Sequence, residues 1–502
     1  MMFPLFSLPN ELIDAIASAV DDRPTLLALA QTCSKLQPFA EAQLFKNIYI
    51  HDGPSVSRLA QSLEQPPERV RAVEHLEVTP TKHSWDGIAL MPELVSRLTR
   101  LKSLKLESPM INTGRRPSWW SDVIMAEYMD LFAGNAASGV WQKGAFECLT
   151  SFTLHSHGTN DRFYNIKTIL PVFLSPTLKL IHLSCIDISG ATETFAEHGS
   201  ESQSTRTPLE TLILQRCKVP ASRLDDFYAV LSRPRALRSF SVLLDTDFHQ
   251  LNAQQAHAPA FIRAIQQHSD SLEYLRYMHR SINRPARGSP EHLNASLLSA
   301  LSSLHQSSSG LSTFNRLHTF DVDHRSNLAE LLLDKELAPQ NLRTLGLTGL
   351  ECDSETWQHL PAFVSAIASA TPFSHLRLHT KPSGRDIKYV SMMFSLHAPT
   401  EHMYGPPQLR YMFLNLVEML DKRSTVKLVC SRQARQLSGF HPPFLYGETL
   451  PDEAVIFDSQ KLWSEEQDLD KRFDVEDYVS EEGEVAGWRG PLSGLGNSYW
   501  KE

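Results

Sequence analysis

Residues 209–219 read LETLILQRCKV, with Leu209, Leu212 and Leu214 spaced three and then two positions apart. Successive side chains of a strand point to opposite faces, so Leu212 and Leu214 share one face while Ile213 lies on the other. Leucine side chains are most stable when they are removed from water. The stretch therefore predicts a short strand whose leucine face is buried and whose opposite face looks outward.

The same unit, Leu-x-x-Leu-x-Leu with other apolar residues allowed, returns from residue 73 onward, and most copies start roughly 25 to 35 residues apart. Segments between the copies carry apolar residues at helical spacing, as in 224–231, 261–265 and 363–367. This alternation predicts an α/β chain, a solenoid with a curved parallel sheet and outer helices. The ten copies are Val73/Leu76/Val78, Leu101/Leu104/Leu106, Leu149/Phe152/Leu154, Leu178/Ile181/Leu183, Leu209/Leu212/Leu214, Leu237/Phe240/Val242, Leu272/Leu275/Tyr277, Leu317/Phe320/Val322, Leu342/Leu345/Leu347 and Phe373/Leu376/Leu378.

Two gaps between copies are longer than the rest. Residues 123–132 have helical spacing and predict an ordered helical insertion, whereas 280–310 are rich in Arg, Pro and Ser and predict a partly mobile one. After the last copy, 389–396 and 409–420 predict helices, and the apolar residues around Leu428 predict a closing strand.

The end of the chain is acidic. Asp and Glu dominate residues 448–484, which predicts a solvated, partly disordered extension. The alternative is a docking segment anchored by Trp463, Phe473 and Tyr478.

The first fifty residues predict three short helices. Leu8, Leu12, Ile13, Ile16 and Val20 fall on one side of a helical projection and polar residues on the other. Asp21-Asp22-Arg23-Pro24 ends this helix; a second run then extends from Leu26 to Cys33, and a third from Leu36 to Ile48.

Composition excludes several function classes. A net charge of -9 gives no long-range attraction to nucleic acid or anionic lipid, and no stretch has the roughly 20 apolar residues of a membrane span. Six scattered cysteines without a CxxC pair indicate a reducing compartment, the cytoplasm or the nucleus, and neither a zinc site nor a disulfide framework.

No catalytic signature occurs either: the chain has no GxSxG, GxxxxGK[ST], GxGxxG or HExxH. His155 and His157 would share a strand face, but no third metal ligand has diagnostic spacing. We therefore expect a protein that is not an enzyme and has no cofactor or metal.

Two resemblances give these patterns a family context. Leu8-Pro9-x-Glu11-Leu12-x-x-x-Ile16, followed by Leu26-Leu27-x-Leu29-Ala30-x-Thr32-Cys33-x-x-Leu36, resembles the F-box of fungal F-box proteins, although Phe39 and Phe45 stand where many members have Trp. The resemblance covers about the first fifty residues and implies docking onto the Skp-family adaptor of a cullin-RING ubiquitin ligase. The adaptor-binding residues that it implies are Leu8, Pro9, Leu12, Ile16, Leu26, Leu27 and Leu29.

A segment this small also rarely buries enough surface to fold alone, so another chain or the first repeat should cover part of it. The alternative interpretation makes these helices a cap of the solenoid.

The later units resemble leucine-rich repeats, and Cys217 matches the cysteine of the repeats found beside F-boxes. We expect Cys217 to be a small buried residue rather than a reactive thiol.

The residue between the last two apolar positions of each copy should line the open face of the sheet. This row is mixed and mainly polar, which suits recognition of a protein better than enclosure of an apolar small molecule. Because Tyr and Arg are enriched in binding hot spots, Tyr274, Arg276, His375, Arg377 and His379 are predicted to bind the substrate protein. The row is Glu77, Lys105, Thr153, His182, Ile213, Ser241, Arg276, Asp321, Gly346 and Arg377.

The sequence thus predicts an F-box-like helical module at 1–50, a leucine-rich-repeat solenoid at 51–435 and an acidic extension at 436–502. The expected function is substrate recognition for an SCF-type ligase. A repeat scaffold that binds a partner without any ligase is the runner-up, and an enzyme with an unrecognised site is the weakest alternative.

Overall fold

The computed structural model describes residues 7–65, 67–79, 87–107, 122–133, 146–155, 163–197, 206–219, 223, 225–244, 260–279, 310–324, 326–350, 354–380, 427–433 and 453–458. The chain divides into two compact units, of which the first is formed mainly by Met1–Leu183 and the second begins at Ser184. The class is α/β, with parallel strands accompanied by helices.

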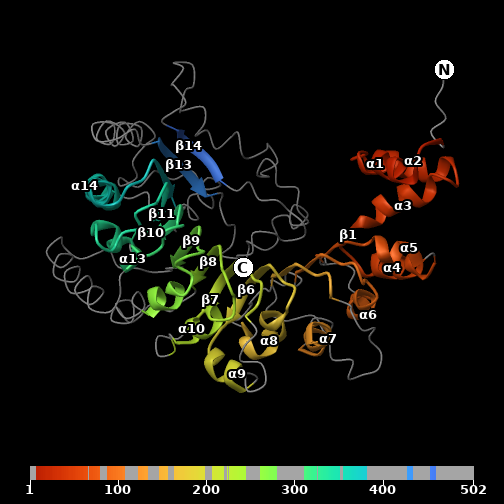
Figure 1. Cartoon of the computed structure of the whole chain (residues 1–502), viewed down its shortest axis with the longest axis horizontal. Helices are drawn as coiled ribbons and strands as arrows, with labels where there is room; N and C mark the ends of the chain where they lie inside the picture. Colours follow the sequence, from red (N-terminus) through yellow and green to blue (C-terminus); the bar gives the residue numbers. More distant parts are fainter. Residues whose placement is uncertain are drawn as a thin grey trace, which may run out of the picture. The chain divides into compact units, whose positions relative to one another are not determined.

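Three short helices open the first unit, as expected: α1 (Asn10–Ser18), α2 (Arg23–Thr32) and α3 (Gln37–Lys46), drawn in red in Figure 1. The Asp22 carboxylate accepts a hydrogen bond of 2.9 Å from the Thr25 N–H and so caps α2. The buried residues of these helices are Ile13, Ala17, Leu26, Ala40 and Leu44.

The third helix is shorter than expected. It ends at Lys46, and β1 (Asn47–Ile50) begins at the next residue, so Ile48 belongs to a strand and its helical assignment was wrong. The β-branched Ile48 and Ile50 point to one face, where both are buried.

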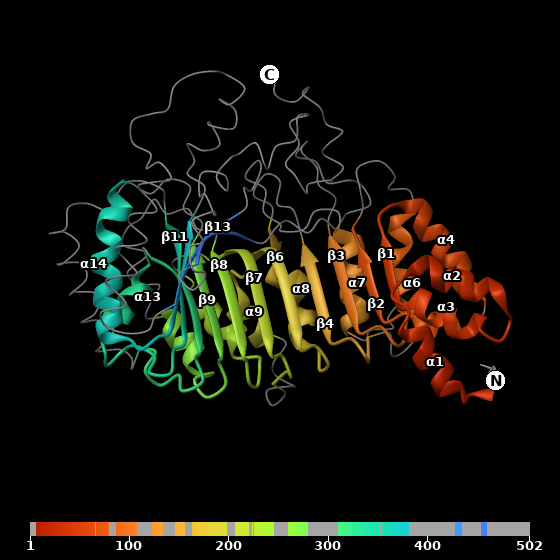
Figure 2. The ribbon, with the colours of Figure 1, turned by 90° about the horizontal axis from the view of Figure 1, so that it is seen from above.

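Parallel strands pair in register in the first unit: β1, β2 (His75–Val78), β3 (Ser103–Glu107), β4 (Ser151–His155) and the first half of β6 (Leu180–Asp187). Figure 2 shows these strands side by side. One buried row crosses all of them and consists of Ile48, Leu76, Leu104, Phe152 and Ile181.

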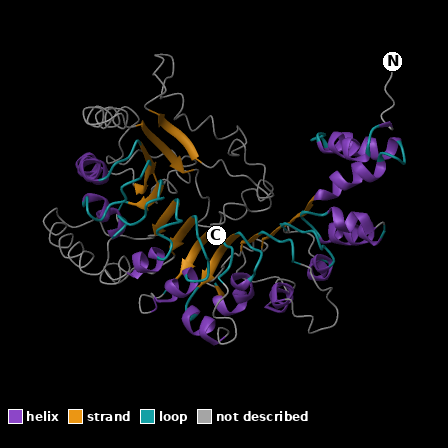
Figure 3. Cartoon of the chain, viewed as in Figure 1, coloured by secondary structure: helices purple, strands orange, loops and turns teal. Residues whose placement is uncertain are grey.

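Helices of the first unit connect these strands. α6, α7 and α8 lie on one side of the strands in Figure 3, where helices are purple and strands orange. The helix α7 confirms the insertion predicted at 123–132. The connecting elements are α4 (Gly53–Glu64), α5 (Pro67–Ala72), η2 (Ile88–Leu90), α6 (Met91–Ser96), α7 (Asp122–Ala133), β5 (Tyr164–Asn165) and α8 (Ile166–Leu174).

The second unit repeats the same plan. Strands β7 to β13 follow one another in parallel pairs, and β14 pairs with β13 in the antiparallel sense. Its strands are β7 (Thr211–Lys218), β8 (Ser239–Leu244), β9 (Tyr274–His279), β10 (Thr319–Asp323), β11 (Thr344–Leu350), β12 (His375–Thr380), β13 (Lys427–Gln433) and β14 (Glu453–Asp458). Its helices are α9 (Ala191–Glu197), α10 (Asp225–Leu231), a helical stretch at 260–266, α13 (Asn327–Glu330), η5 (Leu331–Leu333) and α14 (Ser354–Ala370).

The apolar triplets form the core as expected. Every residue of the ten copies is buried except Phe373, which is half-buried. Cys217 is fully buried, and burial raises the pKa of its thiol, so the expectation of an inert cysteine is confirmed. The strand predicted around Leu428 is present as β13.

The acidic C-terminal region departs from its prediction at one place. Residues Glu453–Asp458 form the strand β14, which the prediction did not include, because the run Ala-Val-Ile-Phe within them suits a strand. The helices predicted at 389–396 and 409–420, the insertion at 280–310 apart from its last residue, and the segment around Trp463, Phe473 and Tyr478 lie outside the described residues.

Candidate binding surfaces

The N-terminal helices present large apolar side chains to solvent. Leu12 is 50% exposed, Ile16 46% and Leu27 44%, whereas Ile13 and Ala17 of α1 are buried. The apolar side chains that the sequence places on one side of this helix therefore fall into two groups, one buried and one exposed. One edge packs inside the module, and the other is free to contact a partner.

The remaining predicted adaptor-binding residues differ in exposure. Pro9 is exposed, and its carbonyl accepts hydrogen bonds from the N–H groups of Leu12 and Ile13, at 3.0 and 3.2 Å, as α1 begins. Leu8 and Leu29 are half-buried. Leu26 is only 6% exposed, so it lies in the core of the module and supports α2 from within.

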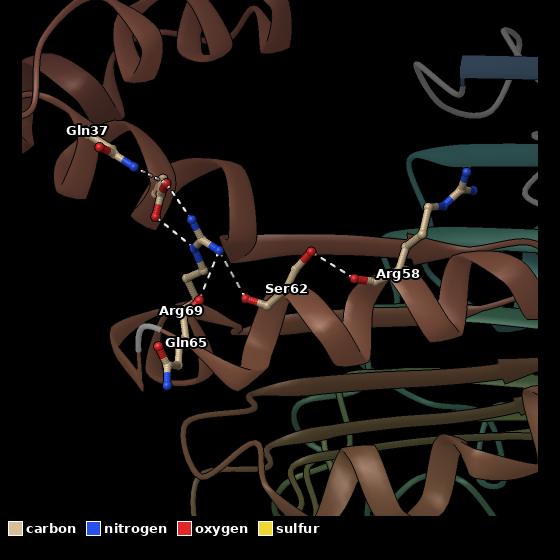
Figure 4. A network of polar contacts seen from close by, with 6 residues as sticks. Gln37, Arg58, Ser62, Gln65 and Arg69 are labelled. Atoms are coloured by element: carbon tan, nitrogen blue, oxygen red, sulfur yellow. Dashed lines mark hydrogen bonds and ion pairs between the residues drawn. The ribbon is translucent and has the colours of Figure 1, made fainter.

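A second feature joins this module to the first repeat, and it centres on Arg69 (Figure 4). Its Nε and one terminal nitrogen donate to the two carboxylate oxygens of Glu41 on α3, at 2.8 and 2.7 Å. Its other terminal nitrogen donates to the carbonyl groups of Ser62 and Gln65 at the end of α4, both at 3.1 Å. The guanidinium also lies 5.3 Å from the centre of the Phe45 ring.

Arg69 and Glu41 each stabilise the charged form of the other. The two bonds from Arg69 hold the pKa of the Glu41 carboxyl below its usual value, and the same bonds raise the pKa of Arg69. Gln37 also donates to Glu41, at 2.8 Å. The ion pair between Arg69 and Glu41 holds α3 against the segment that follows β1. No sequence motif predicted this ion pair.

The outward row of the first unit is aligned as predicted: Glu77, Lys105, Thr153 and His182 occupy one register position on successive strands. Tyr49 on β1, which the sequence prediction did not include, extends this row by one strand. The Lys105 ammonium lies 2.9 Å from a carboxylate oxygen of Glu77 and 2.9 Å from one of Glu107. Burial lowers the pKa of Lys105, but the two carboxylates outweigh it and raise the pKa overall.

The outward row of the second unit is also aligned as predicted. Ile213, Ser241, Arg276, Asp321, Gly346 and Arg377 occupy one register position from β7 to β12. Tyr274 and His375 occupy the preceding outward position on β9 and β12.

Asp321 is the centre of this second surface. The Tyr274 hydroxyl donates a hydrogen bond of 2.8 Å to Asp321 Oδ2. Burial, followed by the charge of Asp321, raises the pKa of Tyr274 well above its usual value, so the phenol keeps the proton that it donates. Asp321 is 5% exposed, and among the described residues its Oδ1 has no hydrogen-bond partner.

Gly346 leaves the space that Asp321 occupies. A Cβ at this position would collide with Asp321 Oδ1 and would lie 2.9 Å from Asp321 Cγ. Any larger residue at 346 would therefore displace the carboxylate. Asp321 belonged to the predicted outward row but not to the predicted binding cluster, and its register between Arg276 and Gly346 was the available signal.

The other members of the predicted cluster have different positions. Arg377 is exposed, and Arg276 is half-buried with its Nε donating to Met278 Sδ at 2.9 Å. His375 is exposed, and its Nδ1 lies 3.0 Å from the hydroxyl of Ser374. His379 belongs to β12, but its side chain lies outside the description.

Within the described ranges, no three His, Cys, Asp or Glu side chains gather as a metal site, and no helix has the length and apolar character needed to cross a membrane. His157, one of the paired histidines, lies outside those ranges. A comparison of the sequence with known protein families and with curated proteins finds no match.

Proposed function

We propose that this protein is the substrate-recognition adaptor of an SCF-type cullin-RING ubiquitin ligase. In this proposal an F-box-like module binds the Skp-family adaptor, and a leucine-rich-repeat solenoid binds the protein to be modified. The protein performs no chemistry of its own; it acts by holding two partners close together.

The observation that carries the proposal is the exposed apolar surface of α1 and α2. Leu12, Ile16 and Leu27 each leave about half of their surface in water, although the same helices bury other aliphatic side chains. Covering such side chains with a partner stabilises a complex by about 1 to 2 kcal/mol each. Leu12 and Ile16 are four residues apart on α1 and therefore lie next to each other on one helix face, which supports a protein partner there.

The Arg69 contact supports the same proposal from the other side of the module. It consists of two hydrogen bonds to Glu41 and two to carbonyl groups of the first repeat. A substrate receptor needs its adaptor-binding helices held firmly to the repeats, because proximity is useful only when orientation is fixed.

The test is recovery of a purified Skp-family adaptor by the immobilised chain. Replacing Leu12 and Ile16 together with Ala should reduce the affinity about tenfold or more, since both side chains are exposed and two aliphatic contacts are lost. The matched control replaces two other exposed apolar residues, Leu90 and Tyr228, and should bind like the parent. Equal recovery by parent and Leu12/Ile16 variant would refute the F-box assignment.

A second function is favoured by a specific observation. Because α3 ends at Lys46 and β1 starts at Asn47, the helices could instead serve as a cap of the first strand in a repeat scaffold without a ligase. In that case the parent chain would not retain the adaptor at all, while partner binding by the repeats would persist.

A further inference from the structure

The surface around Asp321 combines two arginines that form no ion pair among the described residues with a carboxylate oxygen that has no hydrogen-bond partner there. Arg276 and Arg377 belong to one register row, and among the described residues neither forms an ion pair. Between them, Asp321 Oδ1 is buried without a hydrogen-bond partner. A buried carboxylate oxygen that lacks a partner is unfavourable, so a ligand that supplied an N–H would be stabilised there.

The charges decide which kind of ligand fits. The row from Arg276 to Arg377 carries two guanidinium groups and the carboxylate of Asp321, and Asp323 adds a second carboxylate at the next outward position of β10, 3.7 Å from the ring of His324. The two arginines, rather than the net charge, therefore distinguish between ligands. A basic segment would bring a further cation beside Arg276 and Arg377. An acidic segment meets both arginines, and its uncharged backbone N–H can serve Asp321.

The strand spacing sets the distance between the two anionic groups. Arg276 on β9 and Arg377 on β12 are three strand steps apart, which corresponds to about 14 Å at about 4.8 Å per step. An extended chain covers about 13 Å in four residues, and side chains four residues apart point to the same side. The two arginines therefore match acidic residues at positions i and i+4 of an extended segment.

We propose that this surface binds an extended acidic segment of a partner protein, with two carboxylates on Arg276 and Arg377 and a backbone N–H on Asp321 Oδ1. The inference deepens the proposed function, because it names the class of segment that the repeats receive. Tyr274 is a positioning residue here: its hydroxyl holds the other oxygen of Asp321.

The first experiment measures peptide binding to the full chain by fluorescence anisotropy. The probe is a labelled peptide of sequence Gly-Glu-Gly-Ser-Gly-Glu-Gly, which carries its acidic residues at i and i+4. Three matched peptides carry Gln at both positions, Lys at both positions, or the two Glu side by side. The probe should bind most tightly and weaken as salt increases. Equal affinity for the Gln or Lys peptide would overturn the proposal, and equal affinity for the adjacent-Glu peptide would overturn the spacing.

The second experiment compares variants of the chain. Arg276→Gln and Arg377→Gln should each weaken the probe about fivefold or more, since each removes a charge-assisted contact. Arg377→Lys keeps the charge and should restore part of the affinity. The control is Arg263→Gln, an exposed arginine on the helical stretch 260–266 rather than on a strand, and it should bind like the parent. Unchanged binding by Arg377→Gln, or an equal loss in Arg263→Gln, would refute the site.

Two further comparisons distinguish this inference from the proposed ligase role and from binding of the chain's own acidic tail. The arginine variants should retain the Skp-family adaptor like the parent, so loss of peptide binding with intact adaptor recovery concerns this site alone. If the adaptor is not retained but the peptide binds, the ligase role fails and the site stands. Much tighter peptide binding by a chain ending at Asp458 would assign the arginines to the chain's own acidic tail and overturn the choice of a partner.

Discussion

Asp226 is a buried carboxylate that caps the helix of the preceding repeat. Its two oxygens accept hydrogen bonds from the N–H groups of Gly190 and Thr192, at 2.9 and 2.8 Å, where α9 begins. Gly190 has a φ of 84°, a conformation that suits glycine, so the turn and the cap are built together.

We expect Asp226→Ala to destabilise the protein by about 1 to 3 kcal/mol, because the N–H groups of Gly190 and Thr192 lose their acceptor, the first of them in a buried position. The neighbouring Asp225 is exposed, so Asp225→Ala is the matched control and should change stability little. Urea unfolding followed by circular dichroism measures both. Equal effects of the two substitutions would contradict the capping role.

His268 is a second residue whose role is set by burial. Its Nε2 donates to the Leu231 carbonyl at 2.7 Å, and its Nδ1 accepts from the Leu237 N–H at 3.4 Å. A proton on Nδ1 would face a donor, so the ring is held neutral, and burial lowers its pKa below the usual 6.5.

The lowered pKa of His268 predicts a loss of stability in acid. Below about pH 6.5 the unfolded chain takes up a proton more readily than the folded chain. The contribution of His268 is therefore complete above pH 6.5 and is lost as the pH falls through the lower folded pKa. His268→Gln should flatten the decrease in unfolding midpoint between pH 7.5 and 5, whereas substitution of the exposed His75 should leave it unchanged.

Among the elements, the strands offer the sharpest test of the repeat pattern. Leu212 is fully buried, while Ile213 on the same strand lies in the outward row and is half-buried. Leu212→Asp should destabilise the fold by several kcal/mol, because it would place a charge among apolar core residues. Ile213→Asp should cost far less. Thermal unfolding of the two variants decides the assignment of faces, and similar melting temperatures would contradict it.

An element can be predicted from the sequence when its apolar pattern is complete within a few residues and fits only one kind of structure. The alternation within each copy fixed which residues are buried, because a strand has only two faces. The strand β1 was missed although Phe45, Ile48 and Ile50 repeat the same spacing, because Phe45 and Ile48 also continue a helical run. The strand β14 was missed because its short apolar run lies inside an acidic segment.

The side-chain pairs at the two surfaces could not be predicted in the same way. Arg69 and Glu41 are 28 positions apart in the chain, and Tyr274 and Asp321 are 47 apart. Each pair depends on how long the connecting segments are and on which rotamers fit, and neither quantity is encoded in a repeat pattern. The row to which a residue belongs was predictable; its partner within that row was not.

For the molecule as a whole, truncation of the acidic C-terminal region tests which of its residues the fold needs. A chain ending at Asp458 keeps β14 and should melt within a few degrees of the parent, because residues of like charge bury little apolar surface. A chain ending at Asp452 lacks β14 and leaves an edge of β13 unpaired, so it should aggregate more readily. Light scattering and thermal unfolding distinguish the two, and a large loss of stability in the longer chain would show that Trp463 or Phe473 docks.

The alignment of the outward rows has a consequence for how this protein can evolve. Neighbours in the outward row, such as Arg276 and Asp321, are encoded far apart, and each lies between buried residues of its own strand. A single codon change can therefore alter one outward side chain while the core stays as it was. Gly346 is the exception, because Asp321 occupies the space above it. Divergence of specificity among descendants of this chain should accordingly proceed fastest at the outward positions and slowest at residue 346.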